Sequence, residues 1–350
     1  MNAEPIRVLQ IMPAMDAGGM ETFVMNVYRT LDREQVQFDF LYHYDKPCFF
    51  DDEIRALGGR IYKLTVRQDN NLPRYLRELR RLFAAHPEWR IIHGHYSGFG
   101  MFYNPVARRA GIPVRCGHSH NTAYEPNLVG RLDRLMSSFF SAGLTDRFAC
   151  SEKAGQMLYG SKPFTVVPNG IDTARFAARD PQRRALLRGE LGVTDQEILF
   201  GHVGRFSAQK NHPGLLKIFA AVRARLPKAR LVLLGGEPAY IEKMQALAQE
   251  LALGDSVIFA GVRSNIQSFY DAMDAFMLPS LFEGLPVVLV EAQTAGLPCF
   301  VSDTVDPGAA FTDRVRFLPL QDTGVWADAI AAASFRRDPQ AREKAVRAGY

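Results

Sequence analysis

Short apolar runs rich in β-branched residues recur along the whole chain, and each is followed by a stretch with helical periodicity. Runs that are separated by a single helix build right-handed βαβ units, in which the strands are parallel. The pattern therefore predicts an α/β fold with parallel sheets. In the first half we expect strands at residues 7–11, 36–42, 60–64, 91–93, 113–117 and 147–150. In the second half we expect them at residues 165–167, 198–203, 230–234, 257–260, 275–278, 299–302 and 316–318.

The chain has 350 residues, which is enough for two domains of about 150 residues each. Turn-forming residues cluster between the two series of strands, at Gly160, Pro163, Pro168, Asn169 and Gly170. We therefore expect two Rossmann-like domains, over residues 1–165 and 166–330, whose sheets face each other across a cleft. Residues 331–350 read as a helical segment with no cap or breaker at its end. We expect this segment to pack back on the N-terminal domain and to be incomplete in this sequence.

The composition excludes several classes of protein. Hydrophobic residues make up 47% of the chain and charged residues 23%, which is typical of a folded protein and not of a disordered, collagen-like or membrane-spanning one. The start of the chain lacks the basic flank and length of a signal peptide, so we expect a cytoplasmic protein. The cysteines show no metal-ligand spacing, which favours a reducing compartment and buried thiols; they are Cys48, Cys116, Cys150 and Cys299.

The net charge is +5, and the first 165 residues carry most of it, with 21 Lys and Arg against 17 Asp and Glu. Arginines concentrate in residues 67–90, at Arg67, Arg74, Arg77, Arg80, Arg81 and Arg90, among leucines and aromatic residues at helical spacing. Such a basic amphipathic helix could rest peripherally on anionic lipid at the inner membrane face or meet an anionic acceptor. A solvated surface face is the alternative. Because no nucleic-acid recognition motif accompanies the charge, we expect no nucleic-acid partner.

The loop after the strand expected at 275–278 carries the most informative motif. Glu283 precedes a helix that Pro286 opens and that ends before Pro298. The backbone N–H groups at the start of such a helix suit a diphosphate. Glu283 and Glu291 place two carboxylates at two depths, where they could engage two hydroxyl-bearing groups. The alternative is a favourable turn into a helix with no ligand.

Two other loops also follow strands. Arg205 and Lys210 lie after the strand at 198–203 and could converge on one anion, the alternative being exposed loop cations without a ligand. Gly18 and Gly19 follow the first strand. They do not form a G-x-G-x-x-G motif, but they permit close approach of backbone amides to a phosphate or an acceptor.

Histidines follow two further strands, at His93, His95, His118 and His120. Their spacing matches no metal motif, so we favour hydrogen bonds to sugar hydroxyls, with His118 or His120 polarising a reacting group. The alternative for each histidine is a structural role with satisfied hydrogen bonds.

Six segments occur in the order found in the retaining glycosyltransferases of family 4, and together they resemble that family over nearly the whole chain. They are Gly-Gly-Met-Glu at 18–21, His-Ser-His-Asn at 118–121, Val-Pro-Asn-Gly-Ile-Asp at 167–172, Gly-Arg-Phe-Ser-x-x-Lys-Asn at 204–211, Leu-Gly-Gly at 234–236, and the pair of glutamates at 283 and 291. The resemblance implies the GT-B fold and transfer of a sugar from a nucleotide-sugar donor, usually a UDP-sugar in the bacterial capsule and exopolysaccharide enzymes. It implies an acceptor that is lipid-linked or a saccharide.

The resemblance also assigns roles. The residues expected to bind the donor diphosphate are Arg205, Lys210, Gly18, Gly19, Gly284, Leu285 and Pro286. Glu291 would bind the ribose, Val262 and Arg263 would lie near the nucleobase, and His95 and Asn121 would contact the acceptor or sugar. The expected catalytic residues are Glu283, His118 and His120. No Asp-x-Asp motif is present, and we expect neither a metal nor a cofactor.

Two other functions remain open on the sequence. One is a different enzyme on the same fold, such as a sugar-nucleotide epimerase or a phosphorylase, although no convincing lysine motif for pyridoxal phosphate is found. The other is a non-catalytic protein that binds sugar nucleotides. The chain departs from the family at Gly235-Gly236-Glu237, where many members have a Gly-acid-Gly turn.

Overall fold

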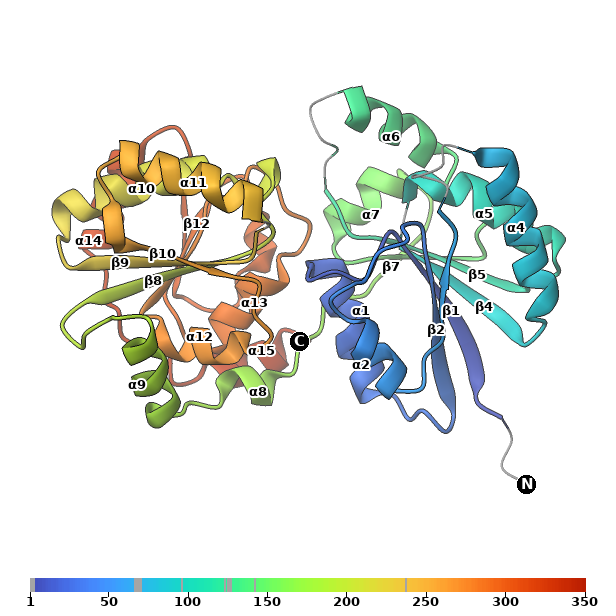
Figure 1. The fold of residues 1–350 in the computed structure, drawn as a ribbon, viewed down its shortest axis with the longest axis horizontal. Coiled ribbons are helices and arrows are strands. Elements are labelled where there is room, and N and C mark those ends of the chain that lie inside the picture. Colours follow the sequence, from blue (N-terminus) through green and yellow to red (C-terminus); the bar gives the residue numbers. More distant parts are fainter. Residues whose placement is uncertain are drawn as a thin grey trace. The chain divides into compact units, whose positions relative to one another are not determined.

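The expected alternation of strands and helices is present in the computed structural model, which describes residues 4–65, 71–95, 97–122, 124, 128–141, 143–236 and 238–350. Each predicted strand has a counterpart, and four have the predicted bounds. The chain divides into two units, Met1–Asn169 and Gly170–Tyr350, and each is built on one parallel sheet (Figure 1). The predicted α/β fold with two Rossmann-like domains is thus confirmed.

The sheet of the first unit has the order β3-β2-β1-β4-β5-β6-β7. Its strands are β1 (Ile6–Met12), β2 (Val36–Tyr42), β3 (Ile61–Lys63), β4 (Trp89–Gly94), β5 (Val114–Ser119), β6 (Asp146–Ala149) and β7 (Thr165–Val166). Its helices are α1 (Gly19–Thr30), α2 (Asp51–Ala56), α4 (Leu72–Ala85), α5 (Ser97–Arg109), α6 (Leu128–Ser138) and α7 (Glu152–Tyr159).

Helices cover both faces of this sheet, because successive residues of a strand point to opposite faces. In β1, Leu9 and Ile11 pack in a core with residues of α4 and α5. Val8 and Met12 belong to a second core, with residues of α1 and α2. Figure 1 shows these two helices beside the sheet. A central strand that is buried on both faces must be apolar almost throughout, as this one is.

The sheet of the second unit has the order β10-β9-β8-β11-β12-β13. Its strands are β8 (Ile198–Val203), β9 (Ala229–Leu234), β10 (Val257–Gly261), β11 (Ala275–Leu278), β12 (Cys299–Ser302) and β13 (Val315–Leu318). Its α-helices are α8 (Thr173–Ala177), α9 (Pro181–Glu190), α10 (His212–Arg225), α11 (Pro238–Glu250), α12 (Ile266–Ala272), α13 (Val287–Thr294), α14 (Thr323–Ala331) and α15 (Ala341–Arg347). Residues of α10, α11 and α14 share one core with the strands.

The structure divides the chain four residues after the predicted boundary at 165. Val166 pairs with Ala149 of β6, so β7 completes the first sheet and does not open the second. The C-terminal segment groups with the second unit, where α15 packs against α8 and α13 through a buried face that carries Ala341 and Ala345. The expectation that it also packs on the N-terminal domain stays a prediction.

The basic stretch at 67–90 also differs from the prediction of one continuous helix. α4 ends at Ala85, and Arg90 lies on strand β4. Arg67 falls outside the described residues. The cysteines are free thiols, and Cys116, Cys150 and Cys299 are buried. Across the described ranges, no helix combines the length and the apolar character needed to cross a bilayer.

Candidate functional site

The central strands of the second sheet fix where a ligand should bind. β8 and β11 are neighbours, yet the chain proceeds from β8 toward one edge of the sheet and from β11 toward the other. In open α/β sheets such a reversal leaves a crevice at the carboxyl ends of the two strands, and ligands bind there. The two loops that leave this point, residues 204–211 and 279–286, are the ones that carry the predicted phosphate and sugar residues.

Lys210 and Glu283 join these two loops. The Lys210 ammonium lies 2.7 Å from a carboxylate oxygen of Glu283, and both side chains are largely buried. Gln209 donates hydrogen bonds to the other carboxylate oxygen, at 3.3 Å, and to the carbonyl of Phe282, at 3.0 Å. Asn211, in the left-handed conformation at φ 55°, donates to the carbonyl of Pro279 at 3.1 Å and caps α10. Glu283 is therefore held in one position from the neighbouring loop.

Helix α13 begins directly after this loop. Pro286 is its N-cap, and no side chain caps its first turn. The adjoining Gly284 and Leu285 are buried, whereas Arg205 on the facing loop is exposed. The positive end of α13 and an exposed cation are thus available to an anion at this edge of the sheet.

Glu291 lies deeper, at the start of the second turn of α13. It is almost completely buried, and one of its oxygens accepts a hydrogen bond of 2.8 Å from the Tyr270 hydroxyl. Burial raises the pKa of Glu291 to about 7, although the Tyr270 hydrogen bond and the charge of Arg175 act in the opposite direction. This carboxylate therefore titrates near neutral pH.

Two glycines after β9 allow the loops to approach closely. Gly235 has φ 109°, and a Cβ atom there would lie 2.2 Å from the carbonyl oxygen of Gly204. Gly236 has φ 90°, and its Cβ atom would meet the ring of Phe206. Both positions require glycine, so this departure from the family's usual turn has a structural reason. Glu237 lies outside the described residues.

The loop after β10 carries the predicted nucleobase residues. Val262 is half exposed, and the Arg263 guanidinium donates a hydrogen bond of 2.8 Å to the carbonyl of Ala260. The amide of Gly235 donates to the carbonyl of Gly261, which ties this loop to the glycines after β9. An exposed apolar side chain next to a fixed guanidinium is suited to stacking against a base.

The first unit has a comparable reversal between β1 and β4. Gly18, which follows β1, is the N-cap of α1, with an extended backbone at φ −141°. This conformation does not need the backbone freedom of glycine that the sequence suggested. A side chain is excluded for another reason, because a Cβ atom at this position would lie 2.3 Å from the Glu21 carboxylate. Gly19 is the first residue of α1.

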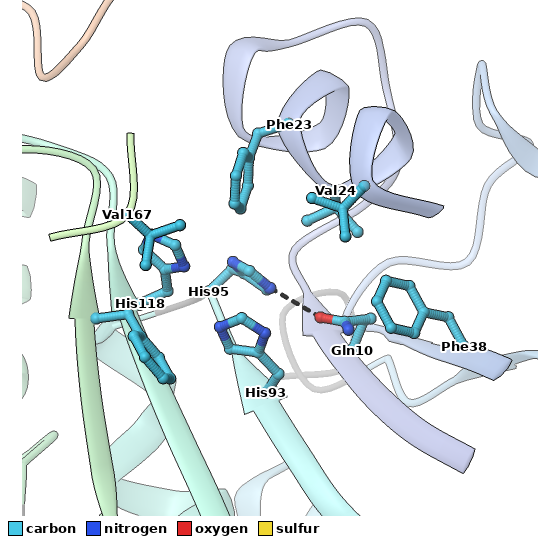
Figure 2. Close-up of a pocket in the computed structure, with 10 residues that line it drawn as sticks. Gln10, Phe23, Val24, Phe38, His93, His95, His118 and Val167 are labelled. Atoms are coloured by element: carbon cyan, nitrogen blue, oxygen red, sulfur yellow. Dashed lines mark hydrogen bonds between the residues drawn. The ribbon is translucent and has the colours of Figure 1, made fainter. Parts of the chain in front are cut away.

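Four histidines gather at the carboxyl ends of β4 and β5. His95 contacts His120 at 2.8 Å through its Nδ1 and the side-chain oxygen of Gln10 at 2.9 Å through its Nε2. The rings of His118 and His120 are stacked, with centroids 4.3 Å apart. Figure 2 shows His93, His95 and His118 beside apolar residues such as Phe23 and Val24, and together they line a pocket of about 200 Å³.

Burial sets the charge of this cluster. It lowers the pKa of His93 to about 4 and that of His120 to about 3. Burial, followed by the neighbouring histidines, lowers the pKa of His95 and His118 well below the ordinary value. These imidazoles are neutral at pH 7, so each can both donate and accept a hydrogen bond. Asn121, at the end of the same segment, is exposed.

Three of these histidines could hold a metal ion, since their nearest ring nitrogens lie within 4.8 Å of one another. These residues are His93, His95 and His118. Both nitrogens of His95 already have partners, so a metal would have to displace Gln10 or His120. The expectation of a metal-free enzyme stays a prediction.

Comparison with known proteins gives the family. A model described as Glycosyltransferase Family 4 matches residues 17–175, and one described as Glycosyl transferases group 1 matches residues 184–346. The putative glycosyltransferase EpsF of Bacillus subtilis is 36% identical, over 100% of this chain and 94% of EpsF. This chain belongs to glycosyltransferase family 4. The predicted resemblance is thereby confirmed, and the chain is a glycosyltransferase.

Two further comparisons extend this result. An Escherichia coli UDP-Gal:alpha-D-GlcNAc-diphosphoundecaprenol alpha-1,3-galactosyltransferase is 25% identical, over 84% of this chain and 78% of its own length. The solved structure of Anabaena HepE in complex with UDP-glucose has a TM-score of 0.75 at 17% identity, and it covers 98% of this chain and 94% of HepE. That similarity establishes the GT-B fold.

Sequence reasoning missed several residues of the family 4 site. Gln209 and Tyr270, which hold the two glutamates, were not singled out, although Gln209 directly precedes Lys210. His202 and His212 lie beneath the same loop, fully buried, with ring centroids 4.9 Å apart. Burial lowers the pKa of His202 to about 4 and that of His212 to about 2. Their positions on either side of the Arg205 loop in the sequence were the available signal.

Proposed function

We propose that this family 4 enzyme transfers a sugar, with retention of configuration, from a UDP-sugar to a lipid-linked or saccharide acceptor in capsule or exopolysaccharide synthesis. The contact between Lys210 and Glu283 at the reversal point of the second sheet carries this proposal. It brings a cation for the diphosphate and a carboxylate for the sugar to one place. The relatives support the substrates, since HepE binds UDP-glucose and the Escherichia coli enzyme acts on a diphosphoundecaprenol-linked sugar.

The chemistry demands stabilisation of the leaving group. When the bond between the sugar and the donor breaks, negative charge develops on the outer phosphate of the nucleoside diphosphate. Lys210 and the N-terminus of α13 are held where they can meet this charge, and Arg205 lies exposed on the same loop as Lys210. Removing one such donor typically lowers the rate about 10²- to 10³-fold. Under this proposal the chain supplies the charge stabilisation itself, and transfer needs no divalent cation.

Glu283 has the role of orienting the donor sugar. Its two oxygens are already engaged by Lys210 and Gln209, at 2.7 and 3.3 Å. A carboxylate held in this way is poised to accept hydrogen bonds from sugar hydroxyls. Retention then follows from attack of the acceptor hydroxyl on the same face that the diphosphate leaves, within a short-lived ion pair. The competing mechanism is double displacement through a covalent sugar ester on a carboxylate.

The histidine cluster of the first unit is proposed to contact the acceptor or the sugar. Neutral imidazoles bind hydroxyl groups in either direction, and His118 has ring nitrogens without a hydrogen-bond partner among the described residues. His118 or His120 would polarise a reacting hydroxyl, and His95, fixed by Gln10, would position them.

A transfer assay tests the proposal. Glu283→Gln keeps the size of the side chain but removes its charge, and Glu242→Gln changes an exposed glutamate on α11 as the matched control. We expect UDP-sugar turnover in the presence of a chelator, an α-linked product from an α-linked donor, and at least a 10²-fold loss in Glu283→Gln alone. An inverted product, or unchanged turnover in Glu283→Gln, would contradict the proposal.

A further inference from the structure

Four buried ring nitrogens of the histidine cluster have no hydrogen-bond partner among the described residues. They are Nε2 of His93, both ring nitrogens of His118 and Nδ1 of His120. His118 is only 1% exposed, so bulk solvent does not replace the missing partners. A buried polar atom without a partner costs free energy, and several of them in one place point to a bound water molecule or an ion. The cluster therefore has binding capacity that the protein itself does not use.

The register of two neighbouring strands brings three of these rings together. His93 and His95 are two residues apart at the end of β4, so their side chains leave the same face of the sheet. β5 pairs with β4 in parallel, with Gly94 opposite Gly117, which places His118 beside His95. The ring centroid of His93 lies 4.2 Å from that of His95 and 5.4 Å from that of His118 (Figure 2). Three imidazoles from two strands thus share one small volume.

The hydrogen bonds of His95 fix where its proton lies. The side-chain oxygen of Gln10 accepts, so the Nε2 of His95, 2.9 Å away, carries the proton (Figure 2). The Nδ1 of His95 then has a lone pair, which accepts a hydrogen bond of 2.8 Å from the Nε2 of His120. Histidines that bind metals almost always donate their other ring N–H to an outer acceptor in this way. Gln10 therefore prepares the Nδ1 of His95 as a metal ligand.

The donor atoms select the kind of ion. The described residues that line the pocket include three imidazoles and no carboxylate. Imidazole nitrogens suit Zn²⁺ and its neighbours in the transition series, whereas Mg²⁺ and Mn²⁺ prefer oxygen ligands. Tetrahedral Zn²⁺ with bonds of about 2.0–2.1 Å needs its nitrogens about 3.4 Å apart, and here the three lie within 4.8 Å of one another. Rotation of the side chains is sufficient to close this difference.

We propose that His93, His95 and His118 form a site for a divalent transition-metal ion of the Zn²⁺ type, bound through three imidazole nitrogens with a fourth position open to the pocket. The ion takes the Nδ1 lone pair of His95, and His120 gives up its hydrogen bond there. Apolar residues such as Phe23 and Val24 line the rest of the pocket and limit the water around the ion.

The metal ion should inhibit sugar transfer, a consequence that rests on the proposed function. Under that function His118 or His120 polarises a reacting hydroxyl. An imidazole whose lone pair is bound to a metal ion cannot accept a hydrogen bond from this hydroxyl. Zn²⁺ should therefore lower turnover over the concentration range in which it fills the site, and Mg²⁺ should not. A chelator should restore the activity.

Metal binding by the full chain tests the proposal without a sugar donor. Calorimetry of Zn²⁺ with the chelator-treated chain should show one site per chain, and bound Co²⁺ should give the visible absorption of a tetrahedral site with nitrogen ligands and no thiolate band. His93→Gln should weaken Zn²⁺ binding at least about tenfold, and Gln10→Leu, which removes the outer acceptor, about 10- to 100-fold. His86→Gln is the matched control, since His86 stacks on Trp89 and contacts Glu88 outside the cluster.

Melting temperatures separate a lost ligand from a lost fold. With a chelator present, His93→Gln and His86→Gln should both give one cooperative transition, and Zn²⁺ should raise the melting temperature of the unmodified chain but not that of His93→Gln. The Co²⁺ spectrum of the unmodified chain needs no variant.

Absence of stoichiometric Zn²⁺ binding, equal affinity of His93→Gln and His86→Gln, or a thiolate band in the Co²⁺ spectrum would overturn the proposal. Unchanged turnover with the site filled by Zn²⁺ would overturn the inhibition. Zn²⁺ binding at this site by a chain that transfers no sugar would support the metal site and contradict the proposed function, so the two can fail separately.

Discussion

Two pairs of polar side chains lie at different depths near the reversal point of the second sheet. Lys210 and Glu283 pair at the mouth of the site, whereas Glu291 and Tyr270 pair in its interior. Pairing at the mouth keeps an ammonium and a carboxylate available to a ligand. Burial in the interior makes the charge of Glu291 depend on pH.

That dependence gives a prediction for nucleotide-sugar binding. If Glu291 binds the ribose hydroxyls as a carboxylate, affinity should rise as the pH increases through about 7, the raised pKa of this group. UDP-glucose is a suitable probe, since its diphosphate does not titrate in this range. Glu291→Gln should bind more weakly and without the pH dependence. Calorimetry at a series of pH values measures this, and a pH dependence that survives in Glu291→Gln would assign it to another group.

Gly235 allows a second prediction, for stability. Gly235→Ala places a methyl group 2.2 Å from the carbonyl oxygen of Gly204 at a backbone φ of 109°. We expect a loss of at least about 1 to 3 kcal/mol in the free energy of unfolding and weaker nucleotide binding. Gly189→Ala is the control, because Gly189 lies within α9 with open space around it, and alanine there should raise stability by up to about 1 kcal/mol. Equal effects of the two substitutions would show that the loop tolerates a side chain.

Among the elements, α12 carries Tyr270 toward Glu291, and arginines fix the C-terminal end of this helix. Arg184 donates to the carbonyls of Asp271, Ala272 and Met273, and Arg188 donates to Ala272. Arg337 donates to carbonyls of the same stretch. The last carbonyls of a helix have no N–H partner within the helix, and the guanidinium groups donate hydrogen bonds to them. The positive charge of these groups also complements the helix dipole.

Arg188 is the most buried of these arginines, and it also pairs with Asp274 at 3.1 Å. Arg188→Met should lower the free energy of unfolding of the second unit by about 3 to 5 kcal/mol, because its partners remain without a donor. Arg225→Met removes an exposed ion pair with Asp328 and should cost less than about 1 kcal/mol. Urea unfolding compares the two, and similar losses would mean that the helix end is satisfied in another way.

The positions of the strands were predictable because a strand that is buried on both faces must be apolar, as β1 and β8 are. The loops that carry the proposed donor-binding residues were predictable as well, since Arg205, Lys210 and Glu283 follow such strands. The pairing of Lys210 with Glu283 was not, because it depends on β8 and β11 becoming neighbours although 71 residues separate Val203, the end of β8, from Ala275, the start of β11. The membership of β7 in the first sheet escaped for the same reason, since strand pairing is a long-range property.

The burial of the histidines also could not be predicted from the sequence. His93 and His118 look like loop residues at strand ends, and nothing local shows that Phe23 and Val24 close a cavity over them. The exposure of Leu128, Leu132 and Leu135 on α6 has the same origin. A helical period reveals an apolar side, but only packing shows whether that side faces the core.

For the molecule as a whole, buried histidines link stability to pH, and more strongly in the first unit. His93, His95, His118 and His120 have pKa values depressed below about 6.5, the unfolded value. As the pH falls through that value, the unfolded chain binds protons that the folded unit does not bind. The free energy of unfolding therefore decreases by up to about 1.4 kcal/mol per pH unit for each histidine.

The second unit should be less sensitive. His202 and His212 act in the same direction, but Glu291, with its pKa raised, binds a proton in the folded state and opposes them between its unfolded value and pH 7. The two tryptophans of the chain report the units separately, Trp89 the first and Trp326 the second. Trp326→Phe leaves Trp89 to report unfolding of the first unit, and Trp89→Phe leaves Trp326 to report unfolding of the second. On acidification we expect the free energy of unfolding to fall more when it is followed through Trp89. An equal pH dependence of the free energy of unfolding in the two variants would contradict this distribution of protons.

The most direct test of the donor site is calorimetric titration of UDP, GDP and ADP, without and with magnesium, into the unmodified chain and Lys210→Met. Lys217→Met, an exposed lysine on α10, is the matched control. We predict that UDP binds without magnesium and that Lys210→Met weakens it at least about tenfold while Lys217→Met does not. Absence of binding by any of the three nucleotides, or equal affinity of Lys210→Met and Lys217→Met, would contradict a diphosphate site at the carboxyl ends of β8 and β11.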